Sequence, residues 1–193
     1  MAVSRGFSEA ERGRIAALYW EAFGAKLGRT LGPGDRARAF IAPRLDPDHA
    51  LVARDGLGHL TGVAGFKTRS GALLDFGIAD LVGSYGLFGG LWRATALSLL
   101  ERDLDNARFL VDGIFVAPEA RGRGVGSDLI GALGREALAR GYSAVRLDVI
   151  DGNDRARRLY ERRGFEPVAR ARTGPLRHLF GFDGATTMVW TLR

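Results

Sequence analysis

The apolar positions change their period twice within one central stretch of the chain. From Leu110 to Val116 they form a short run of strand-forming residues, which Pro118 ends. Residues 119–126 then carry three glycines and two arginines, and from Ser127 to Gly141 the apolar residues recur with a helical period. The pattern predicts a strand, a loop rich in glycine and arginine, and a helix in direct succession.

The same change of period occurs again downstream. Residues 144–150 alternate apolar and polar positions, which predicts a half-buried strand. Asn153 or Asp154 can cap the short helix that follows, and Gly164 can end it. Two further strands are predicted near the end of the sequence, over residues 166–171 and 185–192.

Two helices and a hairpin are predicted ahead of the central stretch. Ser8 and Glu11 form a capping box, and the helix that follows is expected to end near Gly24. Residues 27–44 are predicted to form a loop and a second helix. Residues 50–66 predict a β-hairpin around a turn that contains two glycines.

Residues 77–100 are almost continuously apolar, so a membrane-spanning helix has to be considered. The uncharged part between Asp80 and Arg93 contains only 12 residues, which is shorter than the ~20 needed to cross a bilayer. Its glycines predict an irregular, partly mobile segment that leads into a helix over residues 91–104. The buried stripe of that helix is expected to consist of Trp92, Ala96, Leu99 and Leu100.

Composition limits the class of protein. A chain of 193 residues with 46% hydrophobic and 26% charged residues suits one globular domain over residues 1–193. The absence of cysteine excludes a disulfide framework and thiolate chemistry. His49 and His59 lack metal-ligand spacing, so both are expected at the surface and no metal is expected. No apolar leader begins the sequence, and a cytoplasmic location is expected.

The net charge of +6 rests on arginine, because only two of the 28 basic residues are lysine. The arginines are spread along the chain rather than gathered with exposed aromatic residues, so a solvated surface is favoured over nucleic-acid binding. A nucleic-acid role is kept as an alternative, and it would show as a steep salt dependence of affinity.

A strand, a glycine-rich loop and a helix together present backbone N–H groups and a helix N-terminus to an anion. No lysine follows the glycines, which excludes a Walker A loop, and Ser127 stands where a dinucleotide fingerprint needs its third glycine. The remaining pattern, Arg-Gly-Arg-Gly-Val-Gly over residues 121–126, resembles the acetyl-CoA loop of the GNAT acetyltransferase superfamily.

A second segment carries the same resemblance. The segment is similar to the second GNAT motif at Asn153, Ala156, Leu159, Tyr160, Gly164 and Phe165. The resemblance covers residues 109–168 and implies the GNAT acyl-CoA N-acyltransferase fold, which belongs to the α/β class. Its sheet would be mixed and mostly antiparallel, with about seven strands flanked by helices and a splayed parallel pair at the cofactor site.

The family uses acetyl-CoA, so the resemblance implies a site for this cosubstrate. Its pyrophosphate would lie on the glycine-rich loop, and its pantetheine arm would pair with the central strand like an added strand. Ser127 and Asn153 could instead cap helices, since both roles use the same side-chain oxygen. The cofactor-binding residues implied are Phe115, Val116, Arg121, Gly122, Arg123, Gly124, Val125, Gly126, Ser127, Asn153 and Ala156.

Acetyl transfer to an amine needs one group that accepts the amine proton and one that protonates the leaving thiolate. Asp112 lies on the central strand beside Gly113, which suits a bulge, and related enzymes place a base near this point. Its alternative is a solvated or salt-bridged carboxylate. Tyr160 matches the family's general acid, with ordinary packing as its alternative. Tyr19, Trp20 and Phe23 either face the acceptor or belong to the core.

The resemblance therefore implies an N-acetyltransferase that transfers the acetyl group of acetyl-CoA to the primary amine of a small molecule. It would act as a monomer or a homodimer, without a nucleic-acid or membrane partner. Residues 77–100 are expected either to carry the acceptor specificity or to serve only as core and cover. Two further alternatives stay open beside the nucleic-acid role. One is a protein acetyltransferase of the same fold that modifies an N-terminal α-amine or a lysine, and the other is a CoA-binding module without turnover.

Overall fold

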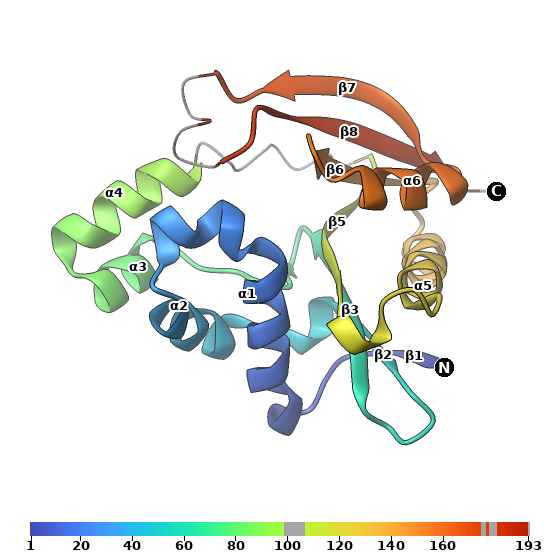
Figure 1. The fold of residues 1–193 in the computed structure, drawn as a ribbon, viewed down its shortest axis with the longest axis horizontal. Coiled ribbons are helices and arrows are strands. Elements are labelled where there is room, and N and C mark those ends of the chain that lie inside the picture. Colours follow the sequence, from blue (N-terminus) through green and yellow to red (C-terminus); the bar gives the residue numbers. More distant parts are fainter. Residues whose placement is uncertain (99–106, 175–176, 178–180, 193) are drawn as a thin grey trace.

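The computed structural model describes residues 1–98, 107–174, 177 and 181–192, and within them eight strands form one sheet (Figure 1). The strands are β1 (Ala2–Arg5), β2 (Ala50–Arg54), β3 (Leu60–Thr68), β4 (Gly71–Ala72), β5 (Phe109–Val116), β6 (Ala144–Ile150), β7 (Glu166–Arg172) and β8 (Gly184–Thr191). Their order is β1-β2-β3-β5-β6-β8-β7, with β4 beside β3. Every pair is antiparallel except β5–β6, which confirms the predicted mixed sheet.

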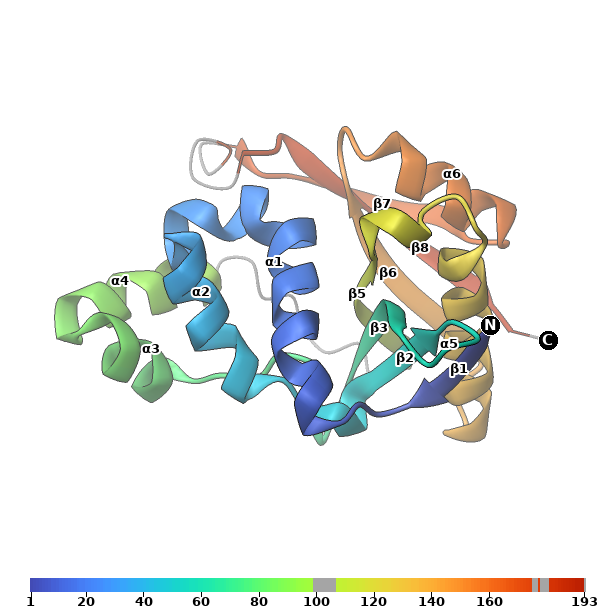
Figure 2. The same ribbon diagram turned by 60° about the horizontal axis from the view of Figure 1, so that its bottom comes forward.

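Six α-helices of the described residues flank the sheet. They are α1 (Glu9–Leu31), α2 (Gly34–Ile41), α3 (Ile78–Tyr85), α4 (Leu87–Ser98), α5 (Val125–Ala139) and α6 (Asp154–Arg162). Figure 2 shows the strands between α1 on one side and α5 on the other, with α3 and α4 forming a hairpin beyond α1 and α2. The sheet is therefore covered on both faces, as a mixed α/β fold requires.

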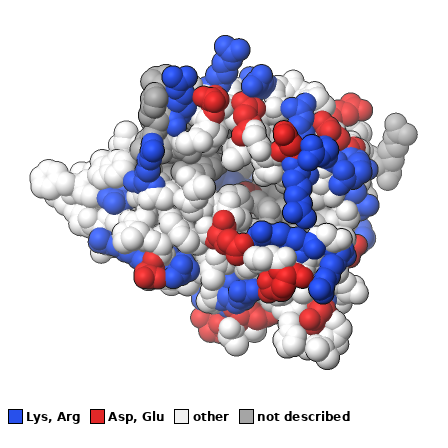
Figure 3. Space-filling model, viewed as in Figure 1, with Lys and Arg blue, Asp and Glu red and all other residues white. Residues whose placement is uncertain are grey.

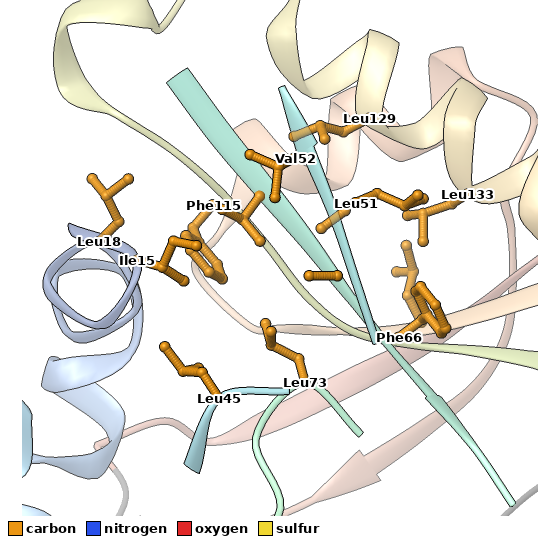
Figure 4. Packing of buried hydrophobic residues seen from close by; sticks show 14 of the residues in the cluster. Ile15, Leu18, Leu45, Leu51, Val52, Phe66, Leu73, Phe115, Leu129 and Leu133 are labelled. Carbon is orange, nitrogen blue, oxygen red and sulfur yellow. The ribbon is translucent and has the colours of Figure 1, made fainter. Parts of the chain in front are cut away.

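The core has two layers, one on each face of the sheet (Figure 4). On one face, Ile15 and Leu18 of α1 approach Phe115 of β5, and all three are almost completely buried. On the other face, Leu129 and Leu133 of α5 cover the strands and are 0% exposed. Both faces of the central strands thus carry apolar side chains, which explains why β5 reads as a nearly continuous apolar run.

Two N-terminal elements differ from the prediction. β1 was not predicted, because two apolar and two polar residues are too few to show a strand pattern. It pairs antiparallel with β2 along its length. α1 does not end near Gly24 but continues to Leu31. An interior glycine costs a helix only about 1 kcal/mol, and the buried side chains of Leu27 and Leu31 favour the longer helix.

The segment over residues 77–98 also differs from the prediction, because it forms two helices instead of a loop before one helix. α3 ends at Gly86, whose φ of 77° turns the chain into α4. A Cβ at Gly90 would lie 2.5 Å from the backbone of Val82, so this glycine allows the two helices to pack closely. Ala96 is buried as expected, but Trp92 is 42% exposed, which contradicts its predicted burial. Leu99 and Leu100 lie outside the described residues.

His49 is buried and not at the surface, which corrects the sequence prediction. It is 5% exposed, and its Nδ1 lies 2.7 Å from Asp46 Oδ2 while its Nε2 lies 2.9 Å from Thr68 Oγ1. Its burial depends on β4, since Gly71 folds over the imidazole ring. His59 is exposed, as predicted.

The capping box of α1 is joined to β2 by an ion pair, which gives the fold a pH-dependent contribution to stability. Arg54 Nε and Nη2 each donate a hydrogen bond of 2.8 Å to the Glu11 carboxylate. These bonds, followed by those from Ser8, lower the pKa of Glu11 to about 2. Because the pKa falls on folding, this stabilisation is present above the ordinary value of 4.5 and is lost as the pH falls toward 2.

Glu11→Gln should therefore lower the free energy of unfolding by roughly 1–2 kcal/mol at neutral pH. The difference from the wild type should shrink as the pH falls below 4.5, and chemical denaturation over this range measures it. Glu9→Gln is the matched control, because Glu9 lies in the same first turn but is 80% exposed in its pair with Arg12. A difference that stays constant at every pH would contradict this role of Glu11.

Candidate active site

β5 and β6 begin as a parallel pair and then separate. Only Phe109 and Leu110 of β5 pair with β6, opposite Val145 and Arg146. Beyond them β5 continues against β3, and β6 continues against β8. In the described part of the chain, the edge of β5 over residues 111–116 therefore has no strand beside it. The predicted splay is present, and it leaves backbone groups available to a ligand.

A bulge interrupts β5 at the predicted place. Gly113 pairs with Gly65 and Val111 pairs with Phe66, so Asp112 is the extra residue on its strand. A Cβ at Gly113 would lie 2.6 Å from the ring of Phe23, so this position admits only glycine without moving α1. The bulge turns Asp112 out of the ladder, where its side chain is exposed.

A cavity of about 1090 Å³ occupies the split between the two strands, at the upper end of small-molecule sites of about 300–1,000 Å³. It is lined by residues 110–114 of β5 and 146–150 of β6, by Tyr19 and Phe23 of α1, and by residues of α3, α4 and α6. Figure 3 shows this face hollowed near its centre, with Lys and Arg gathered over α6. Asp112 and Tyr160 both line the cavity.

Tyr160 is half-buried on α6 and faces the cavity. Burial raises the pKa of its phenol to about 12, so the hydroxyl keeps its proton at neutral pH. Its ring packs against Phe165 with the centroids 5.7 Å apart. No hydrogen bond to the hydroxyl is found within the described residues, which leaves this proton available to a ligand.

Tyr19 also lies at the cavity, and the sequence left its role open. Burial, and then the nearby charge of Asp112, raise the pKa of Tyr19 above its ordinary value. Its ring stands edge-on to Phe115 at 5.8 Å and tilted to Phe23 at 4.8 Å. Tyr19 and Phe23 are therefore both core residues and part of the cavity wall.

The helix that carries Tyr160 begins at Asn153, which caps it. Asn153 Oδ1 accepts a hydrogen bond from the Ala156 N–H at 3.2 Å. Both residues also line the cavity, so the capping role is confirmed and the contact with the cofactor stays a prediction.

The glycine-rich loop leads into the first turn of α5. Gly122 and Gly124 have φ values of 82° and 85°, and no atom lies within 4 Å of a Cβ built on either. Gly124 caps α5, so the helix begins at Val125 and not at Ser127 as predicted. The first helical hydrogen bond runs from Asp128 N–H to Gly124 C=O. The N–H groups of residues 125–127 precede it and have no acceptor within the helix, which is the arrangement that binds anions at helix N-termini.

Gly126 has a packing role that the sequence pattern did not reveal. A Cβ at this position would lie 3.0 Å from Leu159, so the glycine allows α6 to approach the start of α5. Arg163 holds the same junction, since its Nη2 donates to Ser127 C=O at 3.0 Å. The two motif helices are thereby fixed next to each other.

The arginines of the loop are arranged differently from the expectation. Arg121 Nη2 lies 2.6 Å from Glu21 Oε1, and its Nε donates to Val116 C=O at 3.1 Å. Arg121 therefore joins the loop to α1 in this structure, and Val116 C=O already has a partner. Arg123 is exposed, and Phe115 is 4% exposed, so only its backbone could meet a ligand.

Besides Arg172 on β7, two basic residues of the cavity wall, Lys67 on β3 and Arg146 on β6, received no role from the sequence. In the linear sequence each is a single polar residue in a strand pattern. Only the pairing of β3, β5 and β6 places them at one cavity.

The described residues contain neither a cluster of metal ligands nor a helix that could span a membrane. No group of three or more His, Asp or Glu side chains lies close enough to hold a metal ion there. No helix within those residues is long and apolar enough to cross a bilayer.

Comparisons with known proteins agree with this architecture. The profile of the acetyltransferase (GNAT) family matches residues 14–165. A thialysine N-epsilon-acetyltransferase from Bos taurus is 39% identical over 74 residues, which make up 38% of this chain and 42% of that protein. The match therefore spans less than half the length of this curated relative.

Solved structures resemble the whole fold. A ribosomal-protein-alanine N-acetyltransferase from Brucella melitensis superimposes with a TM-score of 0.65 at 19% identity, over 100% of both chains. A streptothricin acetyltransferase from Bacillus anthracis str. Ames, solved in complex with acetyl coenzyme A, gives 0.51 at 15% identity, over 75% of this chain and 62% of its own. At these identities the likeness establishes the fold.

Proposed function

The chain belongs to the acetyltransferase (GNAT) family, and from this we propose that it transfers the acetyl group of acetyl-CoA to a primary amine of a small molecule. The observation that carries the proposal is the cavity between β5 and β6, because Asp112 and Tyr160 both line it beside an unpaired strand edge. A base, an acid and a place for an extended thioester arm are the three requirements of this reaction.

The residues present fit acetyl-CoA. The pantetheine arm can pair with the free edge of β5 over residues 111–116, as an added strand does. The pyrophosphate can accept hydrogen bonds from the first turn of α5, where Gly122 and Gly124 leave the approach open. Arg123 can add a charge-assisted bond, whereas Arg121 would first have to leave Glu21.

The chemistry follows from the protonation states. When bound, acetyl-CoA supplies a thioester carbonyl, at which the acceptor nitrogen forms a C–N bond while the C–S bond breaks. An alkyl amine with a pKa of ~10.4 is mostly protonated at neutral pH, so we assign Asp112 to accept its proton. Tyr160 donates its phenolic proton to the departing sulfur. Solvent restores both groups, since Asp112 is exposed.

The cavity opens at the surface but has walls from several elements (Figure 3), and this shape supports a small acceptor over a protein chain, which needs a long open groove. The curated relative is named for thialysine, and a structural neighbour is named for ribosomal-protein alanine. A panel of small amines and peptides, followed by release of CoA thiol, tests the proposal. A non-catalytic module would bind acetyl-CoA without releasing thiol with any of them, and a protein acetyltransferase would prefer the peptides.

Asp112→Asn should lower kcat/KM most at acidic pH, because unprotonated amine is scarcest there and the amide cannot accept its proton. The loss should be on the order of 10²-fold near pH 6 and should decrease toward the pKa of the amine. The pH dependence of kcat/KM for the best acceptor in the panel measures it.

Asp148→Asn is the matched control for this prediction. Asp148 lines the same cavity from β6, but it accepts a hydrogen bond from Thr187 Oγ1 at 2.5 Å. Its replacement should leave the shape of the pH profile unchanged. If Asp112→Asn also leaves the profile unchanged, the proton is accepted elsewhere and the assignment of Asp112 is wrong.

A further inference from the structure

Lys67 lies on β3 and faces the cavity. Its neighbour Phe66 points to the opposite face of the sheet, where its ring packs on Phe109 and under the guanidinium of Arg140 of α5. Successive side chains of a strand alternate between faces, which places Lys67 on the side of α1 and the cavity wall. Lys67 is partly buried, and within the described residues it has no hydrogen bond or ion pair.

The neighbours of Lys67 on this face do not neutralise its charge. Its two cross-strand partners are Ala72 on β4 and Leu110 on β5, both apolar. On the far side of Leu110 stands Arg146 of β6. Lys67 and Arg146 thus flank Leu110 across the sheet, and their backbones are roughly 10 Å apart at ~4.8 Å per strand. Arg146 has a partner of its own, and Arg172, which also lines the cavity, is exposed on β7, so Lys67 is the cation on which the inference rests.

A partly buried ammonium without a counter-ion favours a ligand that supplies the missing negative charge. The proposed site of proton transfer lies farther along β5, the strand of Leu110, since Asp112 and Gly113 follow Leu110 by two and three residues. At ~3.3 Å per residue this separation is roughly 7–10 Å. The wall of the same cavity also includes apolar residues, Leu74, Phe76 and Leu97 among them.

We propose that the acceptor is an ω-amino acid, whose carboxylate binds Lys67 while its distant primary amine lies at Asp112. The methylene chain between the two groups then lies against the apolar wall. An amino acid that reacts at its α-amine is too short, because its amine and carboxylate share one carbon. This inference rests on the acetyltransferase function proposed above and specifies the acceptor of that same site.

The experiment compares three acceptors at each chain length, an ω-amino carboxylate, its uncharged carboxamide and the corresponding diamine, from β-alanine to ω-aminooctanoate. The wild type should show the highest kcat/KM with an ω-amino carboxylate of intermediate length. Lys67→Met should raise KM for that carboxylate roughly 10- to 100-fold, the effect of losing a bond to a charged group. KM for the carboxamide and the value of kcat should change little.

Two further variants separate charge from shape. Lys67→Arg keeps the positive charge and should retain most of the preference for the carboxylate. Lys67→Glu should reverse the preference, so that the diamine becomes a better acceptor than the ω-amino carboxylate. Arg69→Met is the matched control, because Arg69 lies two residues along the same hairpin but outside the cavity wall, and it should not alter the preference. Thermal unfolding and acetyl-CoA affinity should stay at wild-type values in all four variants.

The possible failures are distinguishable. If the wild type binds no acetyl-CoA and releases no thiol, the proposed function is wrong and this inference is wrong with it. Three results would overturn the inference alone. The wild type could acetylate the carboxylate and the carboxamide equally, or it could acetylate other amines but no ω-amino acid. Lys67→Met could lose its activity toward the carboxylate and the carboxamide to the same extent. A weaker affinity of Lys67→Met for acetyl-CoA would assign Lys67 to the cofactor and would also overturn the inference.

Discussion

Tyr160→Phe should lower kcat on the order of 10²-fold while the protein stays folded and binds acetyl-CoA with nearly unchanged affinity. The substitution keeps the ring that packs against Phe165 and removes only the hydroxyl. Within the described residues this hydroxyl has no hydrogen-bond partner, so its removal leaves no donor or acceptor of the fold unsatisfied. The whole loss should therefore appear in the chemical step.

The raised pKa of Tyr160 adds a pH criterion. A phenol whose pKa is about 12 keeps its proton throughout the range in which the enzyme can be assayed. The wild type should therefore show no decline of kcat from Tyr160 between neutral pH and the alkaline limit of the assay. The defect of Tyr160→Phe should be equally large across that range.

The acyl donor provides a second criterion for the general acid. A donor whose leaving group is a weaker base than the CoA thiolate needs less protonation, so it should reduce the defect of Tyr160→Phe. Tyr142→Phe is the matched control, because Tyr142 packs on Phe109 outside the cavity wall, and it should keep wild-type kcat. Wild-type turnover by Tyr160→Phe with its best acceptor would show that Tyr160 only packs.

Gly124→Asp should abolish measurable acetyl-CoA binding while the protein stays folded. The new carboxylate would stand at the cap of α5, where a pyrophosphate is proposed to bind. Two like charges about 4 Å apart repel by roughly 4 kcal/mol at an effective dielectric constant of about 20, which corresponds to ~10³-fold in affinity. The same carboxylate complements the helix dipole at the start of α5, which partly offsets the strain of a side chain at a φ of 85°.

Gly124→Asn is the control that separates charge from shape. Gly124 has a φ of 85°, and Asn and Asp are the residues that tolerate this left-handed region best after glycine. The two variants therefore share the same size and backbone strain and differ by one charge. Calorimetry should show a modest loss for Asn and no detectable binding for Asp, with similar thermal midpoints. Equal affinities of the two variants would show that the phosphates bind elsewhere.

The central part of the fold was predictable because its signals are local. Pro118, Gly124 and Gly164 stand at or beside element boundaries, and the change of apolar period marks β5, α5 and β6 within a few residues. Asp112 and Tyr160 lie 48 positions apart in the sequence, and the order of the two motifs was enough to predict that the fold would bring them to one cavity. Their catalytic roles remain predictions.

The features that sequence reasoning missed depend on contacts between distant residues. The glycines of residues 77–98 count against a helix one by one, and only the approach of Gly90 to Val82 shows that they allow a helical hairpin. The partner of Arg121 is Glu21, 100 residues earlier. The row of Lys67, Leu110 and Arg146 exists only once the register of three strands is known.

The short pairing between β5 and β6 also divides the sheet into two parts. Two residue pairs connect these strands, whereas seven connect β6 and β8. α5 contacts β2, β3 and β5 on one side of this connection and β6 on the other, so the helix packs on both parts of the sheet. Its first turn is the proposed anion site. A cofactor that binds there as proposed would therefore contact an element that spans the split in the sheet.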